Sequence, residues 1–290
     1  MIKVLTGVIN ILVLGAGGQL GSEIRNISKN FNYDFIFKNS TQLDITDFGK
    51  IRTFLEFNKV DVIINCSAYT NVGLAESNCS EANIINNLAV ENIAQISKDL
   101  NIKLVHISTD YIFDGRLGVP YVENDQPNPL NVYGKTKFDG ETKITSLCLK
   151  NSIIIRTSWL YSGYGSNFVS KIIEQLKNKN EIYVTDDEWG SPTYAGDLAR
   201  SILKILPYLD SNSTEIYNYC NLGVCSRFQF AKKIESLLSL KNKIRVKKFS
   251  NTVNRPKFSA LNNKKIINKF NLSIPSWENS LKQHILNQSI

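Results

Sequence analysis

A tyrosine and a lysine spaced four residues apart are the side chains in this sequence best suited to proton transfer. Tyr133 and Lys137 lie in the stretch LNVYGKTKFDGETK, whose apolar positions repeat at helical spacing. Residues four apart on a helix share a face, so the phenol and the ammonium group would lie close together. A nearby cation favours phenolate and lowers the pKa of a phenol from about 10. Tyr133 could then donate a proton to a carbonyl oxygen as a hydride reaches the carbon. Taken alone, the pair also fits an ordinary surface helix.

A glycine-rich turn near the N-terminus has the composition of a dinucleotide-binding loop. Residues 10–14 form a short, mainly apolar stretch that predicts a buried strand; the turn GAGGQLG and a helical pattern follow it. Glycines permit the tight turn and let a pyrophosphate approach the backbone at the positive N-terminus of the helix. The residues expected to contact the dinucleotide are Gly15, Gly18, Gln19, Leu20 and Gly21.

The end of the second predicted strand bears on which nicotinamide cofactor is favoured. This strand covers residues 35–37 and ends in Lys38, where an NAD-preferring fold usually places a carboxylate. Lys38 could face the 2′-phosphate of NADPH, so we expect NADPH, with NADH left open; an ordinary surface lysine is the other interpretation. Asp44 and Ile45 are expected to border the adenine. Asp44 could also be the N-cap of a helix over residues 48–57.

Strand-like and helix-like segments alternate along the chain. Predicted strands are residues 10–14, 35–37, 62–65, 104–108, 153–157, 182–185 and 216–219; predicted helices include 48–57, 167–176 and 195–206. This alternation predicts an α/β fold with a Rossmann-like, doubly wound parallel sheet. Residues 1–158 would form the cofactor-binding domain. Residues 159–290 would form mainly a smaller, interleaved C-terminal substrate lobe, although residues 195–222 could return to the first domain.

The strand predicted at residues 104–108 delivers polar side chains to the edge of the sheet where open α/β folds place their chemistry. The residues there are Ser108, Thr109, Asp110 and Tyr111. Thr109 could donate a hydrogen bond to a substrate oxygen, although Ser, Thr and Asp are also favoured in turns after strands. Asn86, in a preceding predicted helix, could support the site; a solvated asparagine is the other interpretation.

Composition indicates a soluble globular protein with uneven charge. The 290 residues are 42% hydrophobic and 21% charged, no apolar run is long enough to span a bilayer, and residues 1–9 form an ill-defined leader. Five scattered cysteines and two histidines favour a reducing cytoplasm and predict no metal site. The formal charge is +8, and residues 232–269 carry twelve Lys and Arg against one Glu. This basic segment favours a phosphorylated ligand or a solvated surface over nucleic acid.

Several longer strings resemble one family of reductases. In chain order they are GGQLG, LDITD, DVIINCSAYT, STDYIFDG, PLNVYGKTK, RTSWLY, GSPTYAGDLA and RPKFSAL. With the glycine turn and the Tyr-x-x-x-Lys pair, they resemble the dTDP-4-dehydrorhamnose reductase family of the extended short-chain dehydrogenase/reductase superfamily. The resemblance extends over residues 10–285, and STDYIFDG and PLNVYGKTK are its most specific parts.

The resemblance implies a reduction and assigns roles to individual residues. Thr109, Tyr133 and Lys137 would form a catalytic triad: Tyr133 donates the proton, Lys137 holds the nicotinamide ribose, and Thr109 orients the C4 carbonyl of the sugar. NADPH would reduce a nucleotide-linked 6-deoxy-4-keto sugar, foremost dTDP-4-dehydro-L-rhamnose to dTDP-L-rhamnose, for cell-surface polysaccharide synthesis. The implied substrate contacts are Asp110, Tyr111, Trp159 and Arg255.

Two positions depart from the family pattern, and other functions stay open. The family commonly has Asp where this chain has Gly73 and Gln where it has Glu188, which leaves the substrate less defined than the fold. A reductase of a different nucleotide 4-keto sugar fits the same residues. A non-catalytic regulatory subunit, similar to the beta subunit of methionine adenosyltransferase, is the alternative from another class. We expect a cytoplasmic enzyme that binds a nucleotide sugar, neither nucleic acid nor membrane, and no metal; a homodimer is left open.

Overall fold

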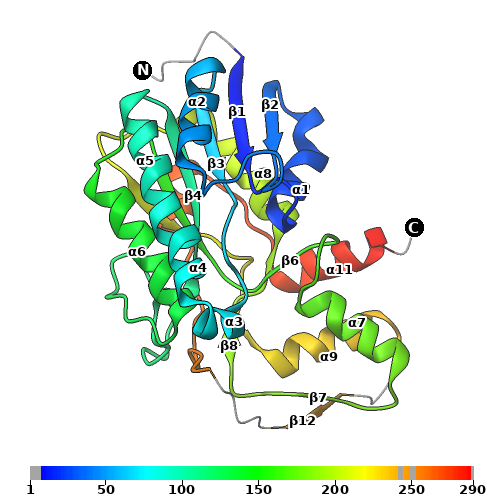
Figure 1. Ribbon diagram of the computed structural model, residues 1–290. Coiled ribbons are helices and arrows are strands. Elements are labelled where there is room, and N and C mark those ends of the chain that lie inside the picture. Colours follow the sequence, from blue (N-terminus) through cyan, green and yellow to red (C-terminus); the bar gives the residue numbers. More distant parts are fainter. Residues whose placement is uncertain (1–7, 241–243, 248–252, 289–290) are drawn as a thin grey trace.

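Six parallel strands form the centre of the structure (Figure 1). The computed structural model describes residues 8–240, 244–247 and 253–288. The strand order is β10-β5-β4-β3-β1-β2, and every pairing in this sheet is parallel. The chain runs from β1 to β2 and then crosses to β3 on the other side of β1, which creates a switch point at the carboxyl ends of β1 and β3. The strands are β1 Ile9–Leu14, β2 Tyr33–Lys38, β3 Val62–Asn65, β4 Lys103–Thr109, β5 Ile153–Thr157 and β10 Glu215–Asn218.

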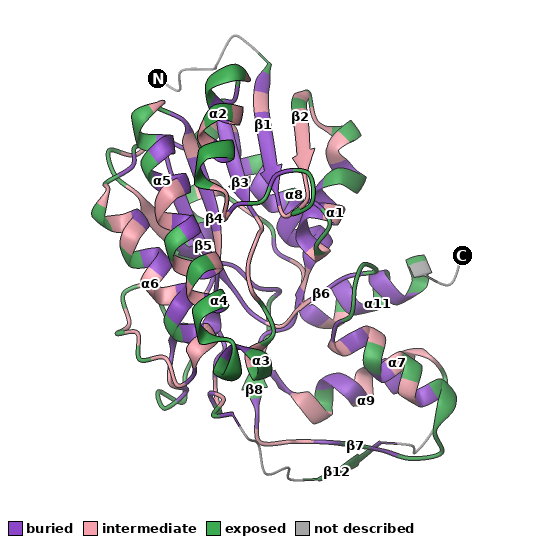
Figure 2. Ribbon diagram, in the orientation of Figure 1, coloured by how far each residue is buried: buried purple, intermediate pink, exposed green. Residues whose placement is uncertain are grey.

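Helices cover both faces of this sheet. Ile11 and Val13 of β1 point into one core layer, and Leu12 and Leu14 into the other, as the twofold period of a strand requires. β3 and β5 are buried at every position, whereas the edge strand β2 is at most half-buried (Figure 2). The first layer lies under α1 Gln19–Ile27, α8 Ala195–Ile205 and α10 Lys264–Phe270, and the second under α2 Phe48–Phe57, α5 Ala89–Asp99 and α6 Val132–Ser146.

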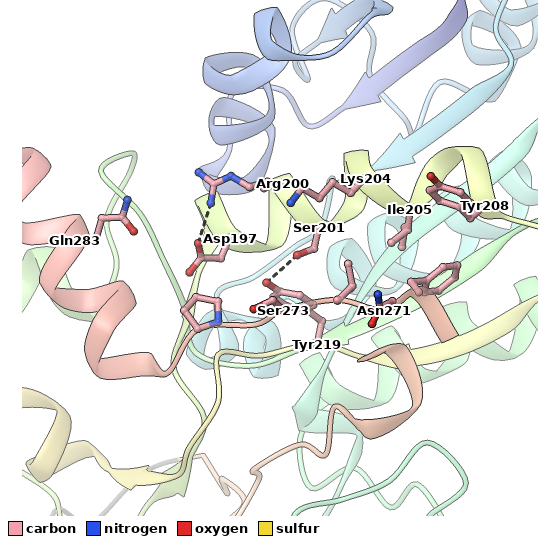
Figure 3. Close-up of a pocket in the computed structure, with 13 residues that line it drawn as sticks. Asp197, Arg200, Ser201, Lys204, Ile205, Tyr208, Tyr219, Asn271, Ser273 and Gln283 are labelled. Carbon is pink, nitrogen blue, oxygen red and sulfur yellow. Dashed lines mark hydrogen bonds and ion pairs between the residues drawn. The ribbon is translucent and has the colours of Figure 1, made fainter. Parts of the chain in front are cut away.

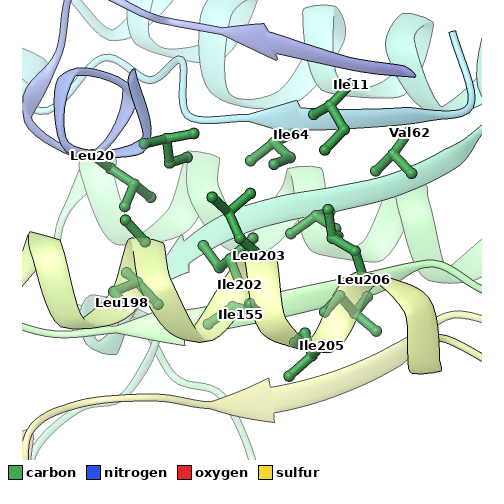
Figure 4. Close-up of a cluster of buried hydrophobic side chains, with 14 of the residues drawn as sticks. Ile11, Leu20, Val62, Ile64, Ile155, Leu198, Ile202, Leu203, Ile205 and Leu206 are labelled. Atoms are coloured by element: carbon green, nitrogen blue, oxygen red, sulfur yellow. The ribbon is translucent and has the colours of Figure 1, made fainter. Parts of the chain in front are cut away.

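Two elements from late in the sequence belong to this sheet layer. β10 pairs with β5, and α8 packs its apolar side chains, among them Leu198, Ile202 and Leu203, against those of the strands (Figure 4). Both lie within residues 195–222, the segment that could return to the first domain. The division of the chain at residue 158 stays a prediction, with β10 placed in the sheet and α8 packed against it.

The remaining C-terminal elements surround a core of their own. Tyr161, Phe230 and Trp277 are among its buried side chains. Its helices are α7 Phe168–Asn178, α9 Arg227–Leu237 and α11 Trp277–Gln288. Its short strands pair as β6 Leu160–Tyr161 with β9 Thr193–Tyr194, β7 Ile182–Val184 with β12 Ile244–Val246, and β8 Trp189–Gly190 with β11 Cys225–Ser226. Figure 1 shows this group of helices beside the carboxyl-end edge of the sheet.

The helix before β4 contains a π-helical turn that changes which residues it buries. α3 (Val72–Ser77) and α4 (Cys79–Asn83) lead into a π-helical segment, Ile84–Leu88, which continues as α5. The wider turn breaks the regular helical spacing. In this segment the apolar Ile84 and Leu88 are exposed, and Asn86 is fully buried. The interpretation of Asn86 as a solvated residue is wrong.

Other sequence-based boundaries are confirmed or corrected at particular residues. The strands at 62–65 and 153–157 and the helix at 48–57 have the predicted bounds. Ile9, assigned to the leader, begins β1, while residues 1–7 of that leader lie outside the described residues. The N-cap of α2 is Asp47, which accepts from Lys50 N; Asp44 instead accepts from Thr46 N. Within the described ranges, none of the helices has both the length and the apolar character needed to cross a bilayer.

Candidate active site

A hollow of about 490 Å³ opens at the carboxyl ends of the parallel strands. It will be called the central hollow. Its wall combines the turn after β1, the residues after β3 and β4, and the first two turns of α6 with residues 157–160 and 165–167 from the start of the second lobe. Of the predicted site residues, it brings together Gly18, Gln19, Leu20, Thr109, Asp110, Tyr133, Lys137 and Trp159.

The glycine turn has the geometry that a phosphate-binding loop needs. Gly15 has φ +71°, and a Cβ there would lie 2.7 Å from Ser67 N, while a Cβ on Gly21 would lie 2.5 Å from Gly15 O. These two glycines pack the turn against β3 and α1 rather than facing the hollow. Gly18 is the N-cap of α1 and provides no side-chain cap, so the first N–H groups of the helix have no side-chain acceptor there. These N–H groups and the helix dipole fit a diphosphate.

Besides Gly15 and Gly21, three more residues assigned to the cofactor do not line the central hollow. Lys38 ends β2, and its ammonium group lies 5.3 Å from the centre of the Phe54 ring. Asp44 caps its own turn by accepting from Thr46 N. Ile45 is 6% exposed and packs in the core layer beneath α2. Their proposed cofactor contacts stay predictions.

Thr109 and Tyr133 meet where β4 ends and α6 begins. Thr109 Oγ1 accepts from Tyr111 N at 3.2 Å and shares a hydrogen bond with the phenol of Tyr133. Asn131 caps α6 by accepting from Gly134 N, so Tyr133 stands in the first turn of the helix. Desolvation raises the pKa of Tyr133 above its ordinary value, although the bond with Thr109 opposes this. The lowering of this pKa expected from Lys137 is therefore not observed in this arrangement.

The amino group of Lys137 lies against β4. Its Nζ donates to Ile107 O at 2.6 Å and lies 3.2 Å from Nε2 of His106. Its side chain is buried, and desolvation lowers its pKa to about 8. Because its charge is thereby disfavoured, the lysine exerts less pull on the phenol than spacing on a helix alone predicts. Two histidines are too few for a metal cluster, so the sequence assigns no role to His106. No spacing rule indicates its contact with a lysine 31 residues later.

Ser108 and Asp110 bring unpaired polar atoms to the hollow. Ser108 Oγ and Asp110 Oδ2 are buried and have no hydrogen-bond partner among the described residues. Burial raises the pKa of Asp110 to about 6. Tyr111 lies outside the hollow, with its ring edge-on to that of Tyr133 at 5.7 Å between centres. A polar ligand in the hollow could complete both orphaned atoms.

A second hollow of about 400 Å³ continues from the first, since Asn167 lines both. It will be called the arginine hollow, because Arg227 and Arg255 line it. The guanidinium carbon of Arg227 lies 3.6 Å from the centre of the Trp159 ring, and Glu188 pairs with Arg227 at 3.5 Å. Arg227 was not singled out in the sequence. It is the first residue of α9, and its neighbours in the chain do not indicate that it stacks on a tryptophan 68 residues earlier.

A third hollow, of about 450 Å³, lies between α8 and the segment joining α10 to α11 (Figure 3). None of the predicted site residues lines it. Four of its polar side chains are paired with one another: Asp197 with Arg200, and Ser201 with the hydroxyl of Tyr219. Of the buried side-chain atoms without a hydrogen-bond partner in the described part of the chain, none belongs to a residue that lines this hollow, whereas Ser108 and Asp110 line the central one.

Comparisons with known proteins agree on one family. The model of the RmlD substrate binding domain matches residues 9–289. The spore coat polysaccharide biosynthesis protein SpsK of Bacillus subtilis is 34% identical over 96% of this chain and 98% of the relative. The dTDP-4-dehydrorhamnose reductase of Aggregatibacter actinomycetemcomitans is also 34% identical, over 94% of this chain and 97% of the relative. The crystal structure of the Bacillus anthracis dTDP-4-dehydrorhamnose reductase in complex with NADP superposes with a TM-score of 0.91 at 35% identity and covers 97% of this chain and 100% of that one.

Proposed function

Because the chain belongs to the family described by the RmlD substrate binding domain, we propose that it reduces the C4 ketone of a nucleotide-linked 6-deoxy-4-keto sugar with NADPH. The substrate is dTDP-4-dehydro-L-rhamnose and the product dTDP-L-rhamnose, a precursor of cell-surface polysaccharide. One observation carries the proposal: Thr109, Tyr133 and Lys137 line a single hollow together with the first residues of α1. A binding module without chemistry would have no need for this combination.

The residues of the central hollow divide the reduction between them. NADPH supplies the hydride when it is bound. The N–H groups at the start of α1 hold its diphosphate, and Lys137, one helical turn beyond Tyr133, binds the nicotinamide ribose. Thr109 orients the ketone oxygen by hydrogen bonding, and Tyr133 donates its proton to that oxygen. Because burial keeps the phenol of Tyr133 protonated at neutral pH, the residue is ready to act as the acid.

The arginine hollow is the proposed site of the nucleotide diphosphate of the sugar. Arg255 and Arg227 are the cations that line it together with Lys171, and the flat guanidinium group matches phosphate oxygens in pairs. Arg227 is already paired with Glu188, so Arg255 is the better candidate for a phosphate contact. Trp159 lines the central hollow next to this pair and would pack against the sugar.

Glu188, one of the two positions that differ from the family pattern, forms an ion pair with Arg227 in this chain. Its carboxylate is buried beside Arg227, where a glutamine would leave the guanidinium without a charged partner. Gly73 is exposed in the first turn of α3, and nothing in the structure explains it. Neither position alters the residues of the central hollow.

A coupled assay tests the function directly. The 4-keto-6-deoxy-L-sugar nucleotide is made in situ, and NADPH oxidation is followed together with formation of the 4-hydroxyl product. Turnover with product formation is expected. A protein that binds NADPH, by fluorescence titration, yet turns over no nucleotide 4-keto sugar would instead be the regulatory subunit. A protein that favours another nucleotide 4-keto sugar would keep the reaction and change the substrate.

The cellular setting is proposed on the same basis. Nucleotide sugars are cytoplasmic metabolites, and the five free cysteines fit a reducing compartment.

We also propose a homodimer; light scattering of the purified protein, with and without NADPH, would test it.

A further inference from the structure

The amino group of Lys137 contacts a histidine that has no part in the reaction described above. His106 Nε2 lies 3.2 Å from Lys137 Nζ. Lys137 Nζ also donates a hydrogen bond to the backbone oxygen of Ile107, the next residue of β4, at 2.6 Å. His106 is 0% exposed and Lys137 1%, so water does not compete for this contact. The strand that delivers Thr109 to the hollow therefore also anchors the lysine.

Asn65 determines where the hydrogen of the imidazole lies. Its Oδ1 accepts from Ser67 N at 3.0 Å, so its amide nitrogen is the atom that faces Nδ1 of His106, at 3.3 Å. An amide nitrogen only donates, so Nδ1 must accept. Burial beside Lys137 lowers the pKa of His106 well below 6.5, so the imidazole is neutral and carries one hydrogen. That hydrogen is on Nε2.

The Nε2–H group of His106 then points at the lysine nitrogen. An ammonium group has three donors and no acceptor, so hydrogens of Lys137 and His106 would face each other. A neutral amine has a lone pair that can accept from Nε2–H, while one of its N–H groups donates to Ile107 O and the other is left for the hollow. Donors and acceptors match only for the neutral amine.

The charged and titratable groups around the lysine do not offset this preference. From α6, Glu141 is bound by Arg156 of β5 at 2.7 Å, and Tyr133 stays protonated. After β3, burial raises the pKa of Cys66 to about 12, so its thiol is neutral. The π-helical segment packed on α6 contributes the neutral amide of Asn86. This amide donates to Tyr69 O and to the hydroxyl of Thr136, the residue before Lys137.

We propose that His106 is a positioning residue for Lys137: Asn65 fixes its imidazole in the tautomer that carries hydrogen on Nε2, and this N–H disfavours the ammonium form of the lysine. A ligand that fills the hollow and offers an acceptor, such as a ribose hydroxyl, shifts Lys137 toward the ammonium form, with the proton taken from solvent. The tautomer rests on the hydrogen bonds of Asn65 and on the burial that keeps the imidazole neutral. Its consequence for turnover rests on the proposed function.

The tautomer can be observed without cofactor or substrate. The chain has two histidines, so ¹⁵N-histidine labelling gives two imidazole spin systems, and His284→Gln assigns them. We expect the long-range ¹H–¹⁵N spectrum of the ligand-free protein at pH 9, above the pKa of about 8 of Lys137, to show His106 with hydrogen on Nε2. Hydrogen on Nδ1, or on both nitrogens, would overturn the proposal. Because no ligand is needed, this result is independent of whether the proposed reaction occurs.

Asn65→Asp reverses the tautomer at almost constant shape. The carboxylate keeps an acceptor for Ser67 N and now accepts from Nδ1–H of His106, so Nε2 becomes the acceptor for the Lys137 ammonium group. NADPH affinity, measured by fluorescence against pH, should weaken in the wild type above about pH 8, where Lys137 loses its proton. In the variant the decline should move upward by about 1 pH unit or more, since the charged form is now favoured.

A double variant separates the effect of the imidazole on NADPH affinity from the effect of the added carboxylate. In Asn65→Asp/His106→Leu the carboxylate is retained and the relay through the ring is removed, so the alkaline decline should return toward the wild-type position. A shift that persists in the double variant would show that the carboxylate acts directly on Lys137 and would overturn the role given to His106. If the wild-type protein binds no NADPH, the proposed function is refuted. The NMR measurement then still decides whether the proposed tautomer of His106 is correct.

Discussion

Tyr133→Phe removes one hydroxyl and little else. The Phe ring can keep the edge-on contact with Tyr111, and the helix cap at Asn131 is untouched. The folded protein loses the hydrogen bond with Thr109, which contributes about 1 kcal/mol to the free energy of unfolding. If Tyr133 is the proton donor, kcat falls by roughly 10²–10⁴, or about 2.7–5.4 kcal/mol in the activation barrier. The effect on the barrier should therefore exceed the effect on stability several-fold.

The assay is NADPH oxidation with the 4-keto sugar made in situ, together with thermal melting and cofactor titration. NADPH affinity should persist in Tyr133→Phe, because Lys137 and the N-terminus of α1 are intact. Lys137→Met should lower affinity and turnover together. Tyr208→Phe, at a half-exposed tyrosine in the third hollow, is the matched control and should behave as wild type. A Tyr133→Phe variant that turns over like the wild type would refute the assignment of the acid.

Three further substitutions test the remaining assignments. Lys38→Ala should reduce the preference for NADPH over NADH by about tenfold or more, the value of a charge-assisted contact with the 2′-phosphate; an unchanged ratio of kcat/KM values for the two cofactors would remove Lys38 from the cofactor site. Arg255→Ala should raise KM for the sugar nucleotide and leave kcat nearly unchanged, with Lys257→Ala, an exposed cation two residues away, as the control; equal KM values for both variants would contradict the phosphate contact. For Asp110, burial raises the pKa to about 6 in the folded protein, so the folded state holds a proton that the unfolded state releases near pH 4. The free energy of unfolding should thus fall as the pH rises from about 4 to about 6, and Asp110→Asn should reduce this dependence in denaturant titrations. An equal pH dependence in the wild type and the variant would show that a group other than Asp110 titrates.

The order of the elements and the main catalytic candidates follow from local sequence. Strand and helix periods predicted the parallel sheet because side-chain alternation depends on neighbouring residues, and the helix at 48–57 and the strand at 153–157 have their predicted bounds. The glycine turn and the spacing of Tyr133 and Lys137 are equally local. Their meeting in one hollow follows from parallel topology, since every strand of such a sheet delivers its carboxyl end to the same edge.

What the tertiary structure alone decided is the environment of those residues. Helical spacing places Lys137 near Tyr133, but the amino group of the lysine lies against His106 and Ile107, because a buried polar group needs hydrogen-bond partners and β4 supplies them. Arg227 stacks on Trp159 through chain segments far apart in sequence. Burial, and with it the direction of each pKa shift, depends on what packs around a group from other elements. Residue type and spacing do not contain that information. The sequence therefore identified Tyr133 as a candidate proton donor, and only the fold showed that burial keeps its phenol protonated.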